Sequence, residues 1–433
     1  MPTTRRTFLS TAAAGAAVGL ASSASQTAAA STRFGPNDTI GIGLIGCGGR
    51  GRSVLRQHLA VDGVRAVAVC DVHQGRLAQA RKEAGGDQVA AYGDFRKLLE
   101  NKDVDVVIVA PPSHWHVLAT IHACLAGKDV FVEKPLGTSI GEGRAAVKVA
   151  KETGRIVQFG TQQRSWEHYH RAAEIIQSGR LGEISEVKVW DYDYFYPGFG
   201  NPPDSDPPAD LDWDMYLGPA AKVPYNPNRF GNRHYWFHDY AGGWHVDWAV
   251  HHYDVVHWCM GVKHPVAAAA IGGRHAFKEC NSEWPDTFNG ILQYGPGPVA
   301  KQGFLLQYTA RTASRAEQRS HGKRFFGTEA SLIIDRAGLT VTPEIGKSGE
   351  PESFRTSESN HAAAFIQHVR QRTKPFGDIE EGHYSTIPGH LLSIAYLSGS
   401  TIRWDPEKEQ VIDNPQANAL VTRTYREPWT LNV

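Results

Sequence analysis

The stretch IGLIGCGGRG, residues 42–51, joins an apolar run to three regularly spaced glycines. In this G-x-G-x-x-G pattern Gly46 permits a tight turn, Gly48 lets the backbone approach a pyrophosphate, and Gly51 allows a helix to pack closely on a strand. A helix that begins here offers free N–H groups and the positive end of its dipole to phosphates. The stretch therefore predicts a strand–turn–helix unit that binds a dinucleotide.

Asp71 ends the next apolar run and stands twenty residues after Gly51. A carboxylate at this position accepts a hydrogen bond from the ribose 2′-hydroxyl of NAD, and it repels the 2′-phosphate of NADP. Arg76 lies close enough in the sequence to leave NADP open as the second choice. We expect NAD as the cofactor.

Short β-branched runs alternate with amphipathic segments between residues 39 and 160. The runs predict strands over 39–45, 64–70, 104–110, 129–132 and 156–159, and the segments between them predict helices over 52–61, 75–84, 115–126 and 141–153. Alternation at this pace is typical of βαβ units and a parallel sheet. We therefore expect a doubly wound Rossmann domain of the α/β class over residues 38–160.

Two more strand ends carry candidate site residues, because ligands bind beyond the carboxyl ends of the strands in an open parallel sheet. Pro112 and His116 follow the run over 104–110, and Glu133-Lys134-Pro135 follows the run over 129–132. The predicted cofactor-binding residues are Gly46, Gly48, Gly49, Arg50, Gly51, Asp71, Pro112, His116, Glu133 and Lys134.

The sequence changes character beyond residue 160. A predicted helix over 168–179 and a predicted strand over 186–196 precede a stretch rich in proline, tryptophan and tyrosine, 197–240, whose prolines oppose regular structure. Alternating apolar runs predict antiparallel strands over 267–272, 288–294, 303–308 and 331–334, and helices are expected over 362–372 and 388–402. We expect an α+β domain over residues 161–433 for substrate binding and oligomerisation, built on a mostly antiparallel sheet with one open face.

Residues 1–30 have the pattern of an export signal. Thr4-Arg5-Arg6-Thr7-Phe8-Leu9 is a twin-arginine motif, a run of small apolar residues follows it, and Ala28-Ala29-Ala30 offers a cleavage site. The twin-arginine route exports folded proteins, often with a cofactor in place, so we expect a periplasmic or otherwise exported protein. Five scattered cysteines without a C-x-x-C pair indicate buried thiols and no disulfide framework.

Composition argues against several classes of partner. Lys and Arg (45) balance Asp and Glu (45), which gives no case for binding to a nucleic acid or to a membrane surface. No apolar run approaches the roughly twenty residues of a membrane-spanning helix. The chain therefore predicts a globular protein whose partner is a small molecule.

The stretch GWHVDWAVHHYDVVHW, residues 243–258, concentrates titratable side chains beside apolar ones. If residues 247–258 form one helix, then Asp247, His251, Asp254 and Trp258 share a face. This arrangement stacks a histidine between two carboxylates, which favours the protonated imidazole and prepares it for proton transfer. His252 points to the opposite side of that helix, and we expect structural roles for it and for His257.

A divalent metal is an alternative ligand for the same stretch. His245, Asp247 and His251 have suitable spacing, since an i, i+4 pair resembles zinc-binding helices. A third ligand at a fixed spacing is missing and the dinucleotide motif already implies a different chemistry, so we expect no metal site here.

These motifs together resemble the glucose–fructose oxidoreductase, inositol dehydrogenase and rhizopine-catabolism (Gfo/Idh/MocA) family over roughly residue 38 to the C-terminus. The matching features are the glycine motif, Glu133-Lys134-Pro135, and a later G-G-x-x-x-D-x-x-x-H-x-x-D run. The resemblance implies that Lys134 lies near the reacting carbon. It also implies that Asp247 and His251 accompany this lysine as catalytic residues, and that a sugar or polyol hydroxyl is the hydride donor.

Three functions follow from this reading. The first is an NAD(P)-dependent oxidoreductase acting on a sugar, polyol or glycoside hydroxyl, which the aromatic stretch suits because flat rings pack on the C–H faces of a pyranose. The second is a glycosidase that uses NAD without net consumption, by oxidation, elimination, addition and re-reduction. The G-N-x-Y-P-T-H type run of one glycosidase group is missing, which lowers this alternative. The third is a sugar binder whose chemistry has lapsed, and the presence of Lys134, Asp247 and His251 argues against it.

Export bears on how the cofactor is used. The compartment that an exported protein enters holds no maintained pool of free dinucleotide, so we expect the cofactor to be tightly bound and regenerated in place. We also expect a homo-oligomer, because in related proteins the open face of the sheet often forms subunit contacts.

Overall fold

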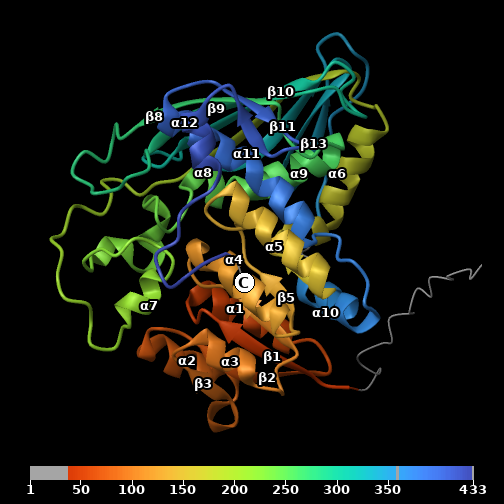
Figure 1. Ribbon diagram of the computed structural model, residues 1–433. Helices are drawn as coiled ribbons and strands as arrows, with labels where there is room; N and C mark the ends of the chain where they lie inside the picture. The colour runs from red at the N-terminus through yellow and green to blue at the C-terminus, as the bar shows by residue number, and fades with distance from the viewer. Residues whose placement is uncertain (1–37, 357–359, 432–433) are drawn as a thin grey trace, which may run out of the picture.

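The computed structural model describes residues 38–356 and 360–431 of the 433-residue chain. The predicted signal segment, residues 1–30, lies outside the described residues. Two sheets and the helices that pack on them build the molecule (Figure 1). In the part of the chain that is described, no helix combines the length and the apolar character needed to cross a bilayer.

The N-terminal sheet has six parallel strands in the order β3-β2-β1-β4-β5-β6. The five expected strands are present, and the sixth is the three-residue β3, which is too short to give an apolar pattern of its own. Their bounds are β1 Ile40–Ile45, β2 Val64–Cys70, β3 Ala90–Tyr92, β4 Val106–Val109, β5 Asp129–Val132 and β6 Val157–Phe159. The doubly wound parallel sheet is confirmed.

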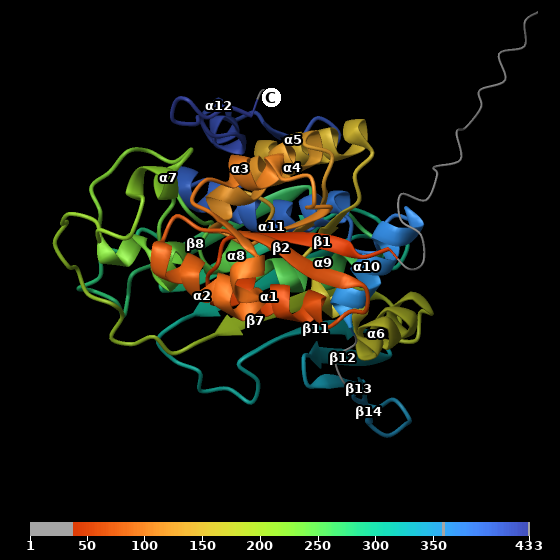
Figure 2. The same cartoon turned by 90° about the horizontal axis from the view of Figure 1, so that it is seen from below.

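Helices cover both faces of this sheet, which is why its strands read as continuous β-branched runs. They are α1 Gly49–Leu59, α2 Gln74–Ala84, α3 Phe95–Glu100, α4 His116–Leu125 and α5 Ile140–Thr153. Figure 2 shows α3, α4 and α5 on one side of β1 and β2, with α1 on the other. A later helix, α10 His361–Gln371, also packs on the α1 side through Phe365, Ile366 and Val369.

The second sheet has ten strands in the order β14-β13-β12-β11-β7-β10-β9-β8-β15-β16. Neighbouring strands are antiparallel except β7 and β10, which are parallel. The strands are β7 Ile184–Tyr192, β8 Ala267–Gly273, β9 Thr287–Tyr294, β10 Phe304–Arg311, β11 His321–Gly327, β12 Ala330–Asp335, β13 Gly338–Pro343, β14 Glu352–Phe354, β15 Ile402–Asp405 and β16 Gln410–Ile412. The mostly antiparallel sheet is confirmed.

Three helices cover one face of this sheet and form its core with it: α6 Glu167–Gln177, α9 Val250–Met260 and α11 Ile379–Ser398. The other face is open, since residues of β9 alternate between buried and exposed and Ile271, Ile291 and Leu305 on adjacent strands are exposed. The expected helix start at residue 388 is wrong. Pro388 lies inside α11, which begins nine residues earlier with Asp378 as its N-cap.

The proline-rich stretch forms an insert that projects from the side of the molecule near α7 (Figure 1). It contains one short helix, α7 Trp213–Leu217, and two 3₁₀ segments, Pro227–Arg229 and Gly231–Trp236. Two more short helices complete the described chain, α8 Trp244–Asp247 and α12 Pro415–Asn418. The expectation of little regular structure in the insert is confirmed.

Candidate active site

A cavity of about 1380 Å³ opens beyond the carboxyl ends of β1, β2, β4 and β5. Its wall includes the glycine turn of the first domain and side chains of the insert, of α8 and α9, and of the second sheet. All ten predicted cofactor-binding residues and all three predicted catalytic residues line it. Stretches far apart in the sequence therefore meet at one place.

The glycine turn has the geometry that the sequence motif predicts. Gly46 has φ of +90°, and a Cβ atom there would lie 2.4 Å from the nitrogen of Pro111. A Cβ on Gly51 would lie 1.9 Å from the carbonyl oxygen of Gly46. Only glycine fits at these two positions, one for the turn and one for the close approach of α1 to β1.

The start of α1 fits a dinucleotide pyrophosphate. A Cβ on Gly48 or Gly49 would meet nothing within 4 Å, so the backbone faces open space. Gly48 is the N-cap of α1, and no side chain caps the helix N–H groups there. These free donors and the positive end of the helix dipole can receive phosphate oxygens.

Asp71 connects the glycine turn to the loop after β2. Its Oδ2 accepts from the backbone N–H of Cys47 at 2.6 Å, and its Oδ1 accepts from that of His73 at 2.8 Å. Burial raises the pKa of this carboxyl, although both backbone bonds oppose the rise. Asp71 and Arg76 both line the cavity, so the two residues that the sequence analysis connected with the choice between NAD and NADP lie in one place.

Arg50 and Glu133 were predicted separately as cofactor contacts, and the structure pairs them. The guanidinium of Arg50 lies 2.6 Å from the carboxylate of Glu133, which is buried. The pair joins the first turn of α1 to the end of β5. It also balances the charge of Glu133 next to Lys134.

Pro112 and His116 belong to the segment between β4 and α4. Pro112 is the N-cap of a 3₁₀ turn, Ser113–Trp115, and His116 begins α4. The ring nitrogens of His116 lie 2.7 Å from the carbonyl oxygen of Pro135 and 2.9 Å from that of Pro111. His116 therefore holds the loop after β4 against the loop that follows Lys134, and burial lowers its pKa.

Lys134 extends from the end of β5 to the second domain. Its Nζ donates to the backbone carbonyl of Asp247 at 2.6 Å and lies 5.9 Å from the ring centre of Tyr235. Burial lowers the pKa of this lysine, while Asp247 and Glu133 act in the opposite direction. The half-buried Lys134 thus contacts the second domain at the wall of the cavity.

Asp247 is buried, and hydrogen bonds hold both of its carboxylate oxygens. Ser113 donates to Oδ1 at 2.9 Å, and the backbone N–H of Gly242 donates to Oδ2 at 3.0 Å. Burial raises its pKa to about 6, against the opposing effects of Lys134, Ser113 and Gly242. Ser113 carried no recognised signal in the sequence, because a single serine after a strand is common.

The expectation of one helix through residues 247–258 is wrong. The chain forms α8 and α9, separated at Trp248 and Ala249. At this break Ala249 N–H donates to the carbonyl five residues earlier, and His251 N–H donates to the one three residues earlier. Such bonds change the helical phase, so residues four apart across the break no longer lie above one another.

His251 is consequently not stacked between two carboxylates. Asp254 follows three residues later in α9, but its carboxylate is engaged by Arg164 at 2.8 Å and by the hydroxyl of Ser385. The ring of His251 instead meets that of Trp248, with 5.8 Å between their centres. His251 does line the cavity, as predicted.

The protonation state expected for His251 is also wrong. Burial lowers its pKa well below the ordinary value, and the positive charges of Lys134 and Arg336 lower it further. No hydrogen-bond partner for its buried Nδ1 is found among residues 38–356 and 360–431. The imidazole is therefore neutral at physiological pH, and a neutral imidazole can accept a proton.

The other histidines of this stretch face away from the cavity. His245 Nε2 contacts the hydroxyl of Ser393 at 2.9 Å, and its ring stacks on Phe288. His252 contacts Asp191 at 2.9 Å, and His257 contacts the hydroxyl of Tyr294 at 2.8 Å. His245, Asp247 and His251 thus do not converge, and the described residues contain no group of three or more potential metal ligands.

Aromatic side chains form part of the cavity wall. They come from the segment after β7, from the insert, from α8 and from the break that follows α8: Phe195, Phe199, Tyr235, Trp236, Trp244 and Trp248. The rings of Trp236 and Trp244 are nearly parallel at 6.1 Å, and Phe195 contacts both. Phe199, Tyr235 and Trp236 belong to the insert whose aromatic composition the sequence analysis connected with sugar binding. Arg336, which also lines the cavity, lies in a β-hairpin without any signal in the sequence.

Two family models match the chain. One, described as an oxidoreductase family with an NAD-binding Rossmann fold, covers residues 40–161. The other, described as the C-terminal alpha/beta domain of the oxidoreductase family, covers residues 166–279 and 351–431. A solved levoglucosan dehydrogenase in complex with NADH and levoglucosan superposes with a TM-score of 0.65 at 16% identity, covering 84% of this chain and 99% of that one.

Curated relatives agree with these models. A glycosyl hydrolase family 109 protein of Saccharopolyspora erythraea is 35% identical over 42% of this chain and 44% of its own length. The scyllo-inositol 2-dehydrogenase (NAD(+)) of Bacillus subtilis is 29% identical over 64% of this chain and 67% of its own length. The chain thus spans less than half the length of the first relative. Because both domain models match in order around the same cavity, the chain belongs to the Gfo/Idh/MocA family of oxidoreductases.

Proposed function

We propose that the protein is an NAD-dependent oxidoreductase that acts on a carbohydrate hydroxyl. The observation that carries the proposal is the meeting of Lys134 from the first domain with Asp247 and His251 from the second, inside the cavity that contains the glycine turn. A bound nicotinamide would supply the acceptor for a hydride from the carbinol carbon.

The side chains of the site have distinct roles in this reaction. His251, neutral because of burial and nearby cations, takes the proton of the substrate hydroxyl. The ammonium of Lys134 stabilises the negative charge that develops on that oxygen. Asp247, fixed by Ser113 and Gly242, holds the backbone carbonyl that receives Lys134. The aromatic wall supports the C–H faces of the sugar.

NAD is the preferred dinucleotide under this proposal. Asp71 presents a carboxylate at the end of β2, where the ribose 2′-hydroxyl lies in doubly wound folds. The guanidinium of Arg76 stacks on the ring of Phe230 and lies 4.3 Å from the centre of that ring. An arginine engaged in this way is less available to a 2′-phosphate.

The way in which the insert covers the first domain supports tight retention of the cofactor. Gln74 N–H donates to the carbonyl of Asp210 at 2.9 Å, Asp212 N–H donates to that of Val72 at 3.0 Å, and Phe230 stacks on His73. The insert is therefore fastened to the loop that carries Asp71. Because Met215, Tyr216, Phe230 and Gly231 line the same cavity as the glycine turn, a dinucleotide there would lie beneath the insert.

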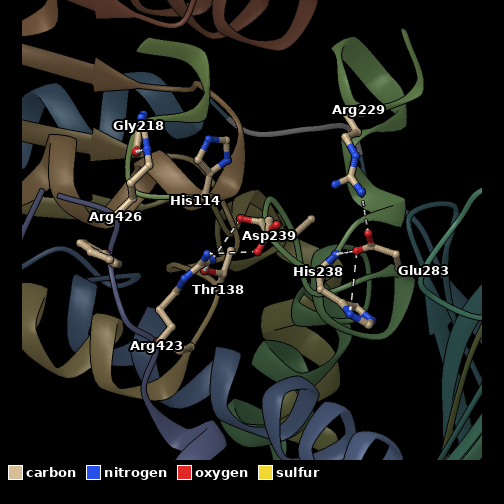
Figure 3. A network of polar contacts seen from close by, with 12 residues as sticks. His114, Thr138, Gly218, Arg229, His238, Asp239, Glu283, Arg423 and Arg426 are labelled. Carbon is tan, nitrogen blue, oxygen red and sulfur yellow. Dashed lines mark hydrogen bonds and ion pairs between the residues drawn. The ribbon is translucent and has the colours of Figure 1, made fainter. Parts of the chain in front are cut away.

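The end of the chain holds the insert in place. Arg426 donates to the carbonyl of Gly218 at 2.9 Å and to the carboxylate of Asp214 at 2.8 Å. Arg423 reaches Thr138 and the carbonyl of Asp239 from the same segment (Figure 3). We call residues 422–431 the C-terminal strap.

Export by the twin-arginine route is part of the same proposal. The motif at Arg5-Arg6 supports it, and a cofactor retained beneath the insert fits a protein that leaves the cytoplasm already folded. A periplasmic enzyme would then regenerate its dinucleotide in place with a second carbonyl substrate. Association of two chains through the open face of the second sheet completes the proposal.

A redox-neutral glycosidase is the second candidate, and the relative of glycosyl hydrolase family 109 favours it. Oxidation of a ring hydroxyl acidifies the adjacent C–H, and loss of that proton expels the aglycone. Water adds to the product and re-reduction restores the hydroxyl. The same Lys134 and His251 serve this cycle, so release of an aglycone without net NADH formation would distinguish it.

The test uses mature protein purified without added cofactor. After denaturation the supernatant is assayed for dinucleotide, and about one NAD(H) per chain is expected. The folded protein is then screened with aldoses, polyols and glycosides for the absorbance of reduced nicotinamide and for reduction of an added carbonyl acceptor. Lys134→Met is expected to keep the dinucleotide and to lose about a hundredfold or more in turnover. Absence of hydride transfer with all sugars would refute the oxidoreductase, and an apoprotein that needs added NAD would refute regeneration in place.

A further inference from the structure

Arg336 is a cation of the cavity wall that has no role in the reaction described above. It lies in the turn between β12 and β13, exposed on one side, and reaches the same cavity as Lys134 and His251. Its guanidinium lies 5.2 Å from the ring centre of Trp248, the residue between α8 and α9. The second sheet therefore places a positive charge at the substrate end of the cavity.

The charge of Arg336 is not neutralised by the protein. Within residues 38–356 and 360–431 this guanidinium makes no hydrogen bond or ion pair, and the adjacent Asp335 pairs with Arg319 at 3.0 Å. The carboxylates that line the cavity have other partners. Asp71 accepts from two backbone N–H groups, Glu133 pairs with Arg50, and Asp247 accepts from Ser113 and Gly242.

The positive charge of Arg336 acts electrostatically on two of the catalytic candidates. Its positive charge contributes to lowering the pKa values of both Lys134 and His251. Three cationic or basic groups thus face one space without a free carboxylate between them. An anionic group on a ligand would relieve this repulsion and would receive the planar donor fork of the arginine.

We propose that the substrate carries an oxyanion, and that Arg336, seated on Trp248, binds it beside the reacting hydroxyl. This proposal rests on the proposed oxidoreductase and deepens it, because it names an acidic saccharide as the substrate class. The oxyanion is a carboxylate, as in a hexuronoside, or a phosphate, as in a hexose phosphate. The cofactor phosphates have their own site at the start of α1, in the first domain.

The experiment measures binding and turnover with ligands that differ in charge. Methyl glucopyranoside, methyl glucopyranosiduronate and glucose 6-phosphate are titrated by calorimetry into the NADH-loaded protein, which cannot oxidise them, and kcat/KM is measured with each in separate assays. The variants are Arg336→Gln and a control, Arg180→Gln. Arg180 is a half-exposed arginine of the second domain that pairs with Glu352 away from the cavity.

In the parent protein an anionic ligand is expected to bind at least about tenfold more tightly than the neutral glycoside, as a charge-assisted hydrogen bond implies. Arg336→Gln is expected to reduce this ratio to about one, and Arg180→Gln to retain it. Preference for the uronoside or for the phosphate identifies the source of the oxyanion. The affinity for NAD is measured in parallel and is expected to be the same in both variants.

Three results would overturn the proposal. The first is that anionic ligands bind no more tightly than the neutral glycoside. The second is that the ratio of anionic to neutral affinity is unchanged in Arg336→Gln. The third is that this variant loses affinity for NAD by the same factor as it loses affinity for the anionic ligand. Because the ratio comes from calorimetry, it is independent of turnover. An Arg336-dependent ratio without hydride transfer to NAD would support the anion site while contradicting the oxidoreductase.

Discussion

Asp247 shows how one buried carboxylate can oppose stability while it organises a site. Both of its oxygens accept hydrogen bonds, yet burial raises its pKa to about 6. The folded protein therefore binds this proton more tightly than the unfolded chain does. Its contribution to stability is complete below the ordinary pKa of 3.8 and is lost as the pH rises through about 6.

We expect the cost of burying the charged Asp247 carboxylate to appear in the pH dependence of the free energy of unfolding. Between pH 4 and pH 7 the free energy of unfolding of Asp247→Asn should rise relative to the parent protein by up to about 3 kcal/mol, since one pKa unit corresponds to about 1.4 kcal/mol. The single oxygen of asparagine leaves one of two donors unpaired, which shifts the whole curve without changing its shape. Urea unfolding at four pH values measures the difference, and parallel curves would contradict the assignment.

The activity of the same variant should fall for a different reason. A protonated or amidated residue 247 can no longer accept from both Ser113 and Gly242, so the carbonyl that receives Lys134 is less firmly held. We expect kcat/KM of the parent protein to decline as the pH falls below about 6. In Asp247→Asn, kcat/KM should be lower at all pH values but should show no such decline at acidic pH. A lower limb that persists in the variant would assign it to another group.

Asp71 determines the choice of dinucleotide under the proposed function. Asp71→Asn keeps an acceptor for one of the two N–H groups that Asp71 binds, those of Cys47 and His73, and removes the charge that repels a 2′-phosphate. We expect the affinity for NADP relative to NAD to rise about tenfold. Fluorescence titration with both dinucleotides measures the ratio. Asp71→Asn combined with Arg76→Gln should lose the gain, and an unchanged ratio in the single variant would show that Asp71 does not face the ribose.

At the level of elements, the N-terminal domain could be predicted almost completely. Strands buried on both faces give long β-branched runs, and glycines at positions such as Gly46 and Gly51 have one structural explanation each. The active-site helix could not be predicted in the same way. Whether α8 and α9 continue through Trp248 depends on packing against the second sheet, and no residue at the break opposes a helix by itself.

Pro388 also shows tertiary packing deciding where a helix runs, here by continuing a helix through a residue that opposes it. A proline lacks an N–H group and usually ends or begins a helix. In α11 it lies within a buried helix whose long apolar face contacts the second sheet, and tertiary packing outweighs the local penalty. The residues of the site that sequence reasoning missed, Ser113 and Arg336, likewise owe their roles to tertiary placement.

The C-terminal strap is the element that we expect to control cofactor release. Arg426→Ala removes the hydrogen bonds to Gly218 and Asp214, and the insert should open more often above the first domain. The rate of NAD release should increase about tenfold, as expected for loss of hydrogen bonds to a charged group. Stopped-flow displacement of NADH measures it. Arg403→Ala, which breaks an exposed ion pair with Asp413, is the control, and equal rates in both variants would show that the strap does not restrain the insert.

For the whole molecule, the open face of the second sheet is the natural surface for association. Ile271 is 75% exposed, Ile291 49% and Leu305 47%, and the three lie on the adjacent strands β8, β9 and β10. An isolated chain would leave this apolar face in water. We expect a homodimer that buries it.

Ile291→Asp tests this surface directly. Two carboxylates brought together at a twofold interface repel each other, so the variant should be monomeric at concentrations where the parent protein is a dimer. Sedimentation equilibrium measures the mass. Leu397→Asp, at a 45% exposed leucine of α11, the helix that covers the opposite face of the sheet, should remain dimeric. A monomeric parent protein would remove the open face as an interface.

The five cysteines have a consequence for where such a protein can work. All are buried and unpaired, and burial raises the pKa values of Cys47, Cys70, Cys124 and Cys259, so little thiolate is present to react. A fold that neither needs a disulfide nor offers a reactive thiol is indifferent to redox potential. It can mature under reducing conditions, cross into an oxidising environment and keep the same covalent structure on both sides.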